Sequence, residues 1–138
     1  PEVTAKLVQA IEDKRFDLIV CNLANLDMVG HTGIIEAAIK AGETVDRAVA
    51  DIVGAMEKAG GIILLTADHG NAEEMLDEAG NPMTAHSLNV VPLVLIGPEQ
   101  WDISLSPGAL CDIAPTILAL MGVDKPGAMT GTNLITKG

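Results

Sequence analysis

The stretch LLTADHGNAEE, Leu64–Glu74, begins with apolar residues and then places an acid, an imidazole and a glycine side by side. The apolar part belongs to the run IILLT, which is typical of a strand covered on both faces in a parallel sheet. Gly60 and Gly61 precede this run and are expected to end a helix. In open α/β sheets, bound molecules and ions collect beyond the carboxyl ends of strands. Asp68 and His69 stand at such a place and are therefore candidate metal-coordinating residues.

Helical and strand-like segments alternate on both sides of this stretch. Apolar residues at helical spacing predict helices over 4–12, about 33–59 and 111–121, the last with Asp112 near its cap, Pro115 in its first turn and Gly122 as its stop. Strand-like runs are FDLIVCNL (16–23), IILLT (62–66) and VVPLVLIG (90–97), where Pro92 implies an edge or an interruption. This order predicts an α/β fold, a three-layer sandwich with a mostly parallel sheet flanked by helices.

A further short helix is expected after the acid and imidazole pair. Asn71 and Glu74 stand three residues apart, which matches a capping box, and the helix would end near 80–82. Glu73 would then be an acid in the first turn, favoured by the helix dipole.

The composition limits the class of protein. The 138 residues fit one domain, and the aliphatic-rich, aromatic-poor sequence suggests a core of Ile, Leu, Val and Ala. Acids outnumber bases by 19 to 8, so the net charge of -11 leaves no basic surface for nucleic acid. The excess acid either confers solubility or is partly offset by bound divalent cations, and charge alone does not choose between the two.

The two cysteines bear on the cellular compartment, and the first residue bears on the length of the polypeptide. Cys21 and Cys111 lie far apart in apolar surroundings, so we expect two buried thiols in a reducing cytosol and no disulfide. The sequence has no secretory leader and no membrane span, and a cytoplasmic protein with no membrane partner is expected. The chain starts at Pro1 without an initiator Met, which suggests a piece of a longer polypeptide.

All three histidines lie next to predicted strands. Asp27 and His31 follow the strand that ends near Asn22, as Asp68 and His69 follow the next one. The two pairs can therefore converge at one edge of the sheet. His86, in TAHS, precedes the strand of 90–97 and reaches that edge if this strand runs antiparallel, as we expect, or if a loop carries the histidine back.

The candidate donors favour a pair of hard or borderline metal ions. Carboxylate and imidazole suit Mn, Zn, Co or Mg. The adjacent Asp68 and His69 cannot easily point at one ion together with three other ligands, so two ions are expected. Such pairs, roughly 3.5 to 4 Å apart, serve phosphoryl or phosphate-ester chemistry and need a nucleophile. Ser87, Ser104 and Ser106 have no base beside them, so no catalytic nucleophile is assigned within this chain.

Five motifs resemble one enzyme family. They are DMVGHTG (27–33), TADHGNAE (66–73), TAHS (84–87) with VPLVLIG behind it, DIAPTIL (112–118) and MTGTNLI (129–135), and they span nearly the whole chain. The sequence is similar to the C-terminal part of the cofactor-independent (2,3-bisphosphoglycerate-independent) phosphoglycerate mutases, members of the alkaline phosphatase superfamily.

The resemblance implies a ligand set and a reaction. Asp27, His31 and His86 would hold one Mn ion, and Asp68 and His69 would hold the other, completed by an aspartate and a serine that are not identifiable here. In this family the serine is the nucleophile, and a phosphoserine intermediate carries the phosphoryl group between the 3- and 2-hydroxyls of glycerate in glycolysis. No bisphosphoglycerate is used, and the substrate is a small phosphorylated molecule.

The resemblance also implies a domain organisation. Residues 1–138 would be the C-terminal part of the metal-binding, alkaline phosphatase-like domain, whose sandwich is incomplete in this chain. The nucleophile-bearing N-terminal part and the substrate domain would be absent. The partner is then the N-terminal remainder of the same polypeptide, the parent enzyme is expected to be a monomer, and the fragment alone is expected to be inactive.

Two alternatives stay open at this point. The ligand set does not by itself separate a glycerate mutase from a phosphopentomutase, a phosphatase or a sulfatase of the same superfamily, although the NAE after ADHG and the HTG after DMVG favour the first. A module that binds metal without catalysis would keep the ligands and lack the upstream aspartate and serine.

Overall fold

The computed structural model describes residues 2–137, and the contacts within the chain divide it into two compact units, Pro1–Pro98 and Glu99–Gly138. Helices and short strands occur in both units. The α/β class expected from the sequence is confirmed. Among the described residues, no helix is both long enough and apolar enough to cross a membrane.

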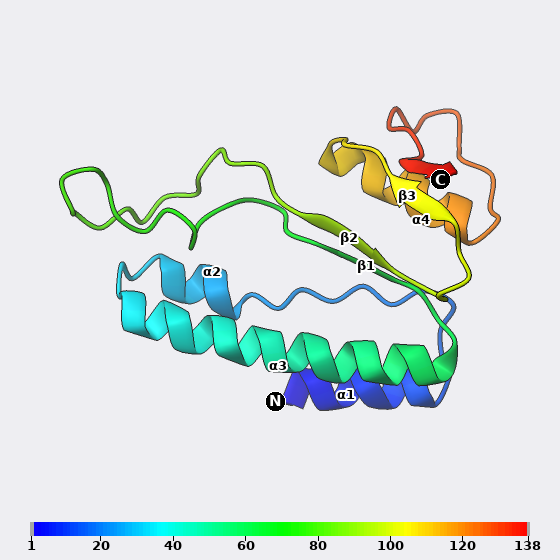
Figure 1. Cartoon of the computed structure of the whole chain (residues 1–138), viewed down its shortest axis with the longest axis horizontal. Helices are drawn as coiled ribbons and strands as arrows, with labels where there is room; N and C mark the ends of the chain where they lie inside the picture. Colours follow the sequence, from blue (N-terminus) through cyan, green and yellow to red (C-terminus); the bar gives the residue numbers. More distant parts are fainter. Residues whose placement is uncertain (1, 138) are drawn as a thin grey trace. The chain divides into compact units, whose positions relative to one another are not determined.

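The described part of the first unit contains three helices, and two of them pack against the longest. These are α1 (Glu2–Glu12), α2 (Asn25–Gly30) and α3 (Ile35–Ala59), and both α1 and α2 contact α3 (Figure 1). The buried residues of α3 are all alanines, Ala38, Ala41, Ala48 and Ala55. Their small side chains allow close approach of the neighbouring helices, and Ile11 of α1 is only 4% exposed. The helices predicted over 4–12 and 33–59 are confirmed.

The α3 helix ends at the predicted glycines. Gly60 has the left-handed φ of 73° that L residues avoid, and the backbone N–H of Gly61 donates to the carbonyl of Met56 at 3.0 Å. This six-to-one hydrogen bond is the Schellman pattern of a helix terminus. It turns the chain into strand β1 (Ile63–Thr66).

The strand β2 (Leu93–Ile96) pairs antiparallel with β1, with Ile63 opposite Ile96 and Thr66 opposite Leu93. The antiparallel direction expected after His86 is therefore confirmed. The strand starts directly after Pro92, the predicted interruption. The prediction of a mostly parallel sheet does not hold for the strand pairs described here, because both are antiparallel.

The predicted strand over 16–23 is not formed by the described residues. The segment is an extended chain without ladder hydrogen bonds, drawn without an arrow between α1 and α2 in Figure 1. A strand needs a neighbour to pair with, and no described segment fills this role. Phe16, Leu18 and Val20, at alternate positions, are exposed by 59%, 49% and 83%.

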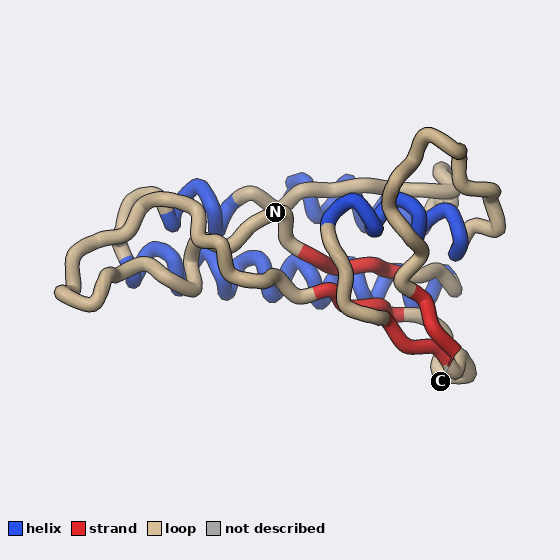
Figure 2. The backbone as a smooth tube through the Cα atoms, turned by 90° about the horizontal axis from the view of Figure 1, so that it is seen from above, coloured by secondary structure: helices blue, strands red, loops and turns tan. Residues whose placement is uncertain are grey.

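The helix predicted after Asn71 is also wrong. Residues 71–92 form a long loop, which Figure 2 shows as tan tube. The backbone N–H of Asn71 donates to Glu73 and not to Glu74, so the capping box is not made. Asp77 instead holds a turn: its side chain accepts from the backbone N–H groups of Ala79 and Asn81 at 2.9 and 2.8 Å. These local bonds replace helical ones.

The second unit is a helix beside a small strand pair. It contains β3 (Ile103–Leu105), the 3₁₀ turn η1 (Leu110–Asp112), α4 (Ile113–Leu120) and β4 (Ile135–Lys137), and β3 pairs antiparallel with β4. Thr116, fully buried, donates to the carbonyl of Asp112 and accepts from the N–H of Leu134. The C-terminal helix, with Asp112 at its cap and Gly122 (φ 67°) after it, is confirmed.

The cysteine expectation is half right. Cys21 and Cys111 are free, but both are exposed where burial was expected. For Cys21 the reason is the unpaired segment of 16–23, which leaves its side chains uncovered within the described chain.

Candidate metal centre

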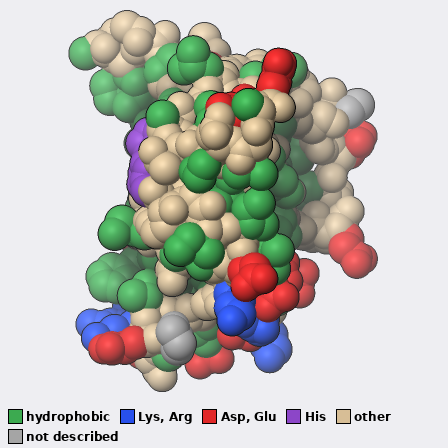
Figure 3. All heavy atoms as spheres, turned by 90° about the vertical axis from the view of Figure 1, so that its left-hand side faces the viewer, with side chains coloured by type: hydrophobic (Ala, Val, Ile, Leu, Met, Phe, Trp, Pro, Cys, Tyr) green, Lys and Arg blue, Asp and Glu red, His purple; other side chains and the backbone are tan. Residues whose placement is uncertain are grey.

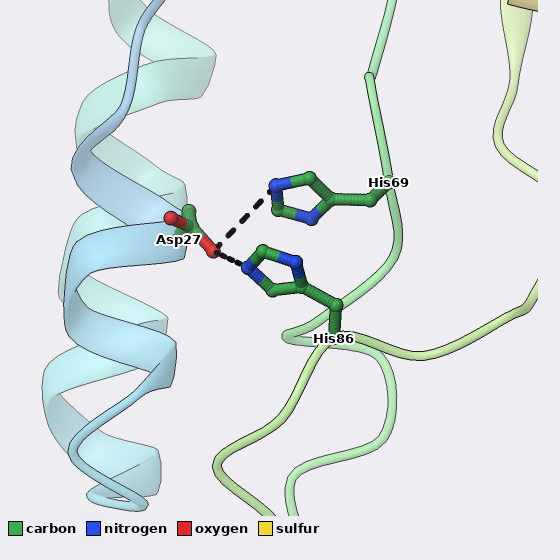
Figure 4. Close-up of side chains that lie close together, drawn as sticks. All are labelled: Asp27, His69 and His86. Atoms are coloured by element: carbon green, nitrogen blue, oxygen red, sulfur yellow. Dashed lines mark ion pairs between the residues drawn. The ribbon is translucent and has the colours of Figure 1, made fainter.

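Four of the five predicted ligands meet in the first unit. Asp27 lies on α2, His31 directly after it, His69 in the loop that follows β1, and His86 in the loop that leads to β2. Figure 4 shows the Asp27 side chain on its helix, facing His69 and His86 on the two loops opposite. The sequence placed Asp27 and His31 beyond a strand, whereas the structure places Asp27 on a short helix.

Three ligand atoms form a nearly equilateral triangle. Oδ1 of Asp27 lies 3.2 Å from Nε2 of His31 and 3.3 Å from Nε2 of His86, and these two nitrogens lie 3.3 Å apart. Donors that share one ion at about 2.1 Å lie about 3.0 to 3.4 Å apart in octahedral or tetrahedral coordination. The spacing therefore fits a divalent ion.

His69 joins the group next to His86, and both rings face Asp27 in Figure 4. Its Nε2 lies 4.0 Å from Oδ1 of Asp27, and its ring stacks on that of His86 at a centroid distance of 3.5 Å. Asp27, His69 and His86 each offer a ligand atom within 4.8 Å of the other two. Asp68 lies beside His69, 3.6 Å from Nε2, but 69% of its side chain is exposed. The ligand role of all five residues stays a prediction.

Backbone carbonyls orient two of the three histidine rings. Nδ1 of His31 contacts the carbonyl of Thr84 at 2.6 Å, and Nδ1 of His69 contacts that of Gly70 at 3.3 Å. Because a carbonyl only accepts, the neutral form of each of these two rings would carry its proton on Nδ1 and keep a lone pair on Nε2. Lone pairs thus converge beside the Asp27 carboxylate, an arrangement that a cation stabilises.

The cluster is accessible from solvent. His31 and His86 are exposed, while Asp27 and His69 are half-buried. Figure 3 shows histidine side chains, in purple, reaching the surface of the molecule.

A comparison with protein families agrees with a metal site. The model of the metalloenzyme superfamily matches residues 1–125. The chain belongs to the metalloenzyme superfamily. The family and the geometry of the cluster together support the use of divalent metal.

Relatives of this metalloenzyme chain share one name. Proteins from Hahella chejuensis, Ruegeria pomeroyi and Methanosarcina barkeri are 55%, 56% and 50% identical over 99% of the chain, and each is named a 2,3-bisphosphoglycerate-independent phosphoglycerate mutase. The chain spans 26 to 27% of their length. The resemblance drawn from the motifs is confirmed.

A solved structure agrees on the fold. The phosphoglycerate mutase of Leishmania mexicana, whose crystal structures were determined at low cobalt concentration, matches 99% of the chain with a TM-score of 0.86 and 28% identity, over 28% of its own length. The incomplete α/β architecture of the metalloenzyme chain is thus that of a part of a larger protein.

Three residues around the candidate site were missed or misread in the sequence. Asn71, 6% exposed, donates from Nδ2 to Oδ1 of Asp27 at 3.3 Å, whereas the sequence suggested a helix cap. Thr84 acts through its carbonyl, which no side-chain pattern reveals. Glu73 does not lie in the first turn of a helix. Its carboxylate accepts hydrogen bonds from the side chains of Ser87 and Asn89, in the loop after His86.

Proposed function

We propose that the chain is the metal-binding C-terminal part of the phosphatase-like domain of a cofactor-independent phosphoglycerate mutase, an isomerase. The full-length protein would interconvert 3-phosphoglycerate and 2-phosphoglycerate without bisphosphoglycerate. The observation that carries the proposal is the triangle of Asp27, His31 and His86, in a chain 50 to 56% identical to proteins of that name.

The proposed ligand sets follow the motifs. Asp27, His31 and His86 would hold one ion, and Asp68 and His69 would contribute to a second. Mn is the first choice, with Zn, Co and Mg as alternatives. When bound, such ions neutralise charge on phosphoryl oxygens and lower the pKa of a coordinated hydroxyl group.

The chain's own residues would orient these ligands. The carbonyls of Thr84 and Gly70 hold Nδ1 of His31 and His69, and Asn71 holds the Asp27 carboxylate. The nucleophilic serine and the substrate-binding groups would come from the remaining polypeptide. We propose a cytoplasmic, monomeric parent.

The full-length protein tests the proposal. It should isomerise 3-phosphoglycerate without added bisphosphoglycerate, lose activity after chelation, and regain it with Mn²⁺. Asp27→Ala and His86→Ala should each lower kcat/KM by at least about 100-fold. Loss of residues that only orient metal ligands costs up to about 100-fold, and loss of a ligand itself should cost at least as much. Full activity in either variant, or in the chelated enzyme, would refute the proposed metal role. Absence of isomerisation by the wild type would refute the proposed substrate.

A further inference from the structure

The Glu73 carboxylate lies between the two loops that carry His69 and His86. On one side it accepts from the backbone N–H of Asn71 at 2.7 Å. On the other it accepts from the Ser87 hydroxyl and from Nδ2 of Asn89, the latter at 3.1 Å. Asn71 is the second residue after His69, and Ser87 directly follows His86. The carboxylate therefore links both histidine loops.

The backbones of the two loops also touch. The N–H of Ser87 donates to the carbonyl of Gly70 at 2.9 Å, in an isolated antiparallel bridge. A Cβ at Gly70 would overlap both the Glu73 carboxylate and the Ser87 hydroxyl. Only glycine leaves room for the carboxylate to reach across, so residue 70 and Glu73 form one arrangement.

The link made by Glu73 lies next to the stacked rings of His69 and His86. The rings of His69 and His86 are stacked with 14° between their planes. Stacking alone is worth about 1 kcal/mol for an aromatic pair, too little to hold two solvent-facing loops together against their conformational entropy.

We propose that Glu73 is a positioning residue that fixes the loop of His69 against the loop of His86 and thereby sets the separation of the two imidazoles. The consequence for metal affinity rests on the proposed function, whereas the fixing of the loops does not. Hydrogen bonds to an ionised acceptor are stronger than neutral ones. The Ser87 hydroxyl above all, with backbone and side-chain donors, lowers the pKa of Glu73 to about 2, so the group is anionic at neutral pH.

Glu73→Gln is the sharpest variant, because it keeps the shape and turns one acceptor oxygen into a donor. That amide must face the N–H of Asn71 or the donors of Ser87 and Asn89, so at least one hydrogen bond is lost. Glu74→Gln is the matched control. It removes the same charge one residue further on, where the side chain contacts Asn89 at 3.3 Å.

The first measurement needs no metal. NMR of the metal-free 138-residue chain should detect nuclear Overhauser effects between the ring protons of His69 and His86. These should vanish in Glu73→Gln and persist in Glu74→Gln, with far-UV circular dichroism unchanged in both. Persistence in Glu73→Gln would overturn the positioning role, whatever the chain binds.

The second measurement follows Co²⁺ by its absorption spectrum and titrates Mn²⁺. Glu73→Gln should weaken affinity by about 10- to 100-fold, as loss of groups that orient ligands does, and Glu74→Gln by less than twofold. The double variant Glu73→Gln, Ser87→Ala should lose less affinity than the sum of the two single losses, because both side chains belong to one hydrogen-bond network. Additive losses would contradict this coupling.

The two proposals fail in different ways. If the wild type and an Asp27→Ala, His86→Ala double variant bind Co²⁺ equally, the metal site is wrong, and the ring-proton effects still decide the role of Glu73. If the wild type binds specifically and Glu73→Gln binds equally well with the same spectrum, the site stands and the positioning role is wrong.

Discussion

At the scale of single residues, the candidate site depends on close contacts that one added methyl group would break. Gly30 lies on α2, one turn after Asp27, and a Cβ there would occupy the position of the Asn71 amide oxygen. Asn71 is buried and holds Asp27 through Nδ2, while its own Oδ1 has no partner among the described residues. Gly30 is therefore needed for space, not for a special backbone angle.

Gly30→Ala should lower the free energy of unfolding by about 1 to 3 kcal/mol, the usual cost of overpacking. Urea denaturation followed by circular dichroism measures this loss. In an Asn71→Ala background the same change should cost less, because the clashing amide is gone. An equal cost in both backgrounds would show that Asn71 is not the clashing group.

At the scale of elements, Gly54 inside α3 and Gly60 directly after it play opposite roles. Gly54 lies inside the helix and Gly60 ends it with a positive φ, and a Cβ at either would meet no atom within 4 Å. Packing is thus equal at the two sites, and only the backbone differs.

Gly54→Ala should raise the free energy of unfolding by about 0.5 to 1 kcal/mol, through helix propensity. Gly60→Ala should lower it by about 1 to 2 kcal/mol, because alanine resists the left-handed conformation. Thermal unfolding of both variants checks the signs. Two shifts of the same sign would contradict the assigned end of α3.

The start of α4 depends on an ionised carboxylate. The backbone N–H of Thr132, then that of Ala109, donates to Asp112 and lowers its pKa below the ordinary value. A depressed folded-state pKa contributes stability that is complete above the unfolded value, near about 3.9, and is lost as the pH falls through the folded-state pKa.

The second unit should therefore lose stability as the pH falls below about 4. Asp112→Asn should be less stable at pH 7 and should flatten this dependence. Hydrogen exchange of the amides of Thr132 and Leu134, measured at several pH values, reports on this unit. Identical pH profiles for the variant and the wild type would contradict the role of Asp112.

At the scale of the whole molecule, much apolar surface is exposed on a chain that spans about a quarter of the length of its curated relatives. Val20, Leu88 and Val90 are exposed by 83%, 103% and 99%. Association with another chain would bury exposed apolar side chains, which is favourable.

Replacing Val20 and Leu88 by Lys should reduce self-association and the binding of apolar dyes, with a change in unfolding free energy of less than about 0.5 kcal/mol each. Sedimentation velocity and dye fluorescence measure this. Ile11→Ala, at a buried position, should instead cost about 2 to 5 kcal/mol. A loss of stability in the Lys variants comparable to that of Ile11→Ala would contradict the described exposure.

Local patterns predicted the helices and their ends well, because these depend on neighbours in the sequence. The spacing in 33–59 and the Gly60–Gly61 pair predicted α3 and its terminus. The same kind of pattern failed at Asn71, where Glu73 reaches Ser87 and Asn89, 14 and 16 residues away, and takes the backbone donor expected to serve a helix. A local capping preference of about 1 kcal/mol was outweighed by several such bonds.

The sequence by itself determined the α/β class, the approximate extents of α1, α3 and α4, and the candidate donors, because these follow from periodicity, glycine and proline stereochemistry and side-chain chemistry. Only the tertiary structure decided that both described ladders are antiparallel, that residues 16–23 stay unpaired, and that Asp27, His31, His69 and His86 converge while Asp68 stays largely exposed. The physical reason is that pairing and convergence depend on contacts between segments far apart in the chain, which no local pattern encodes.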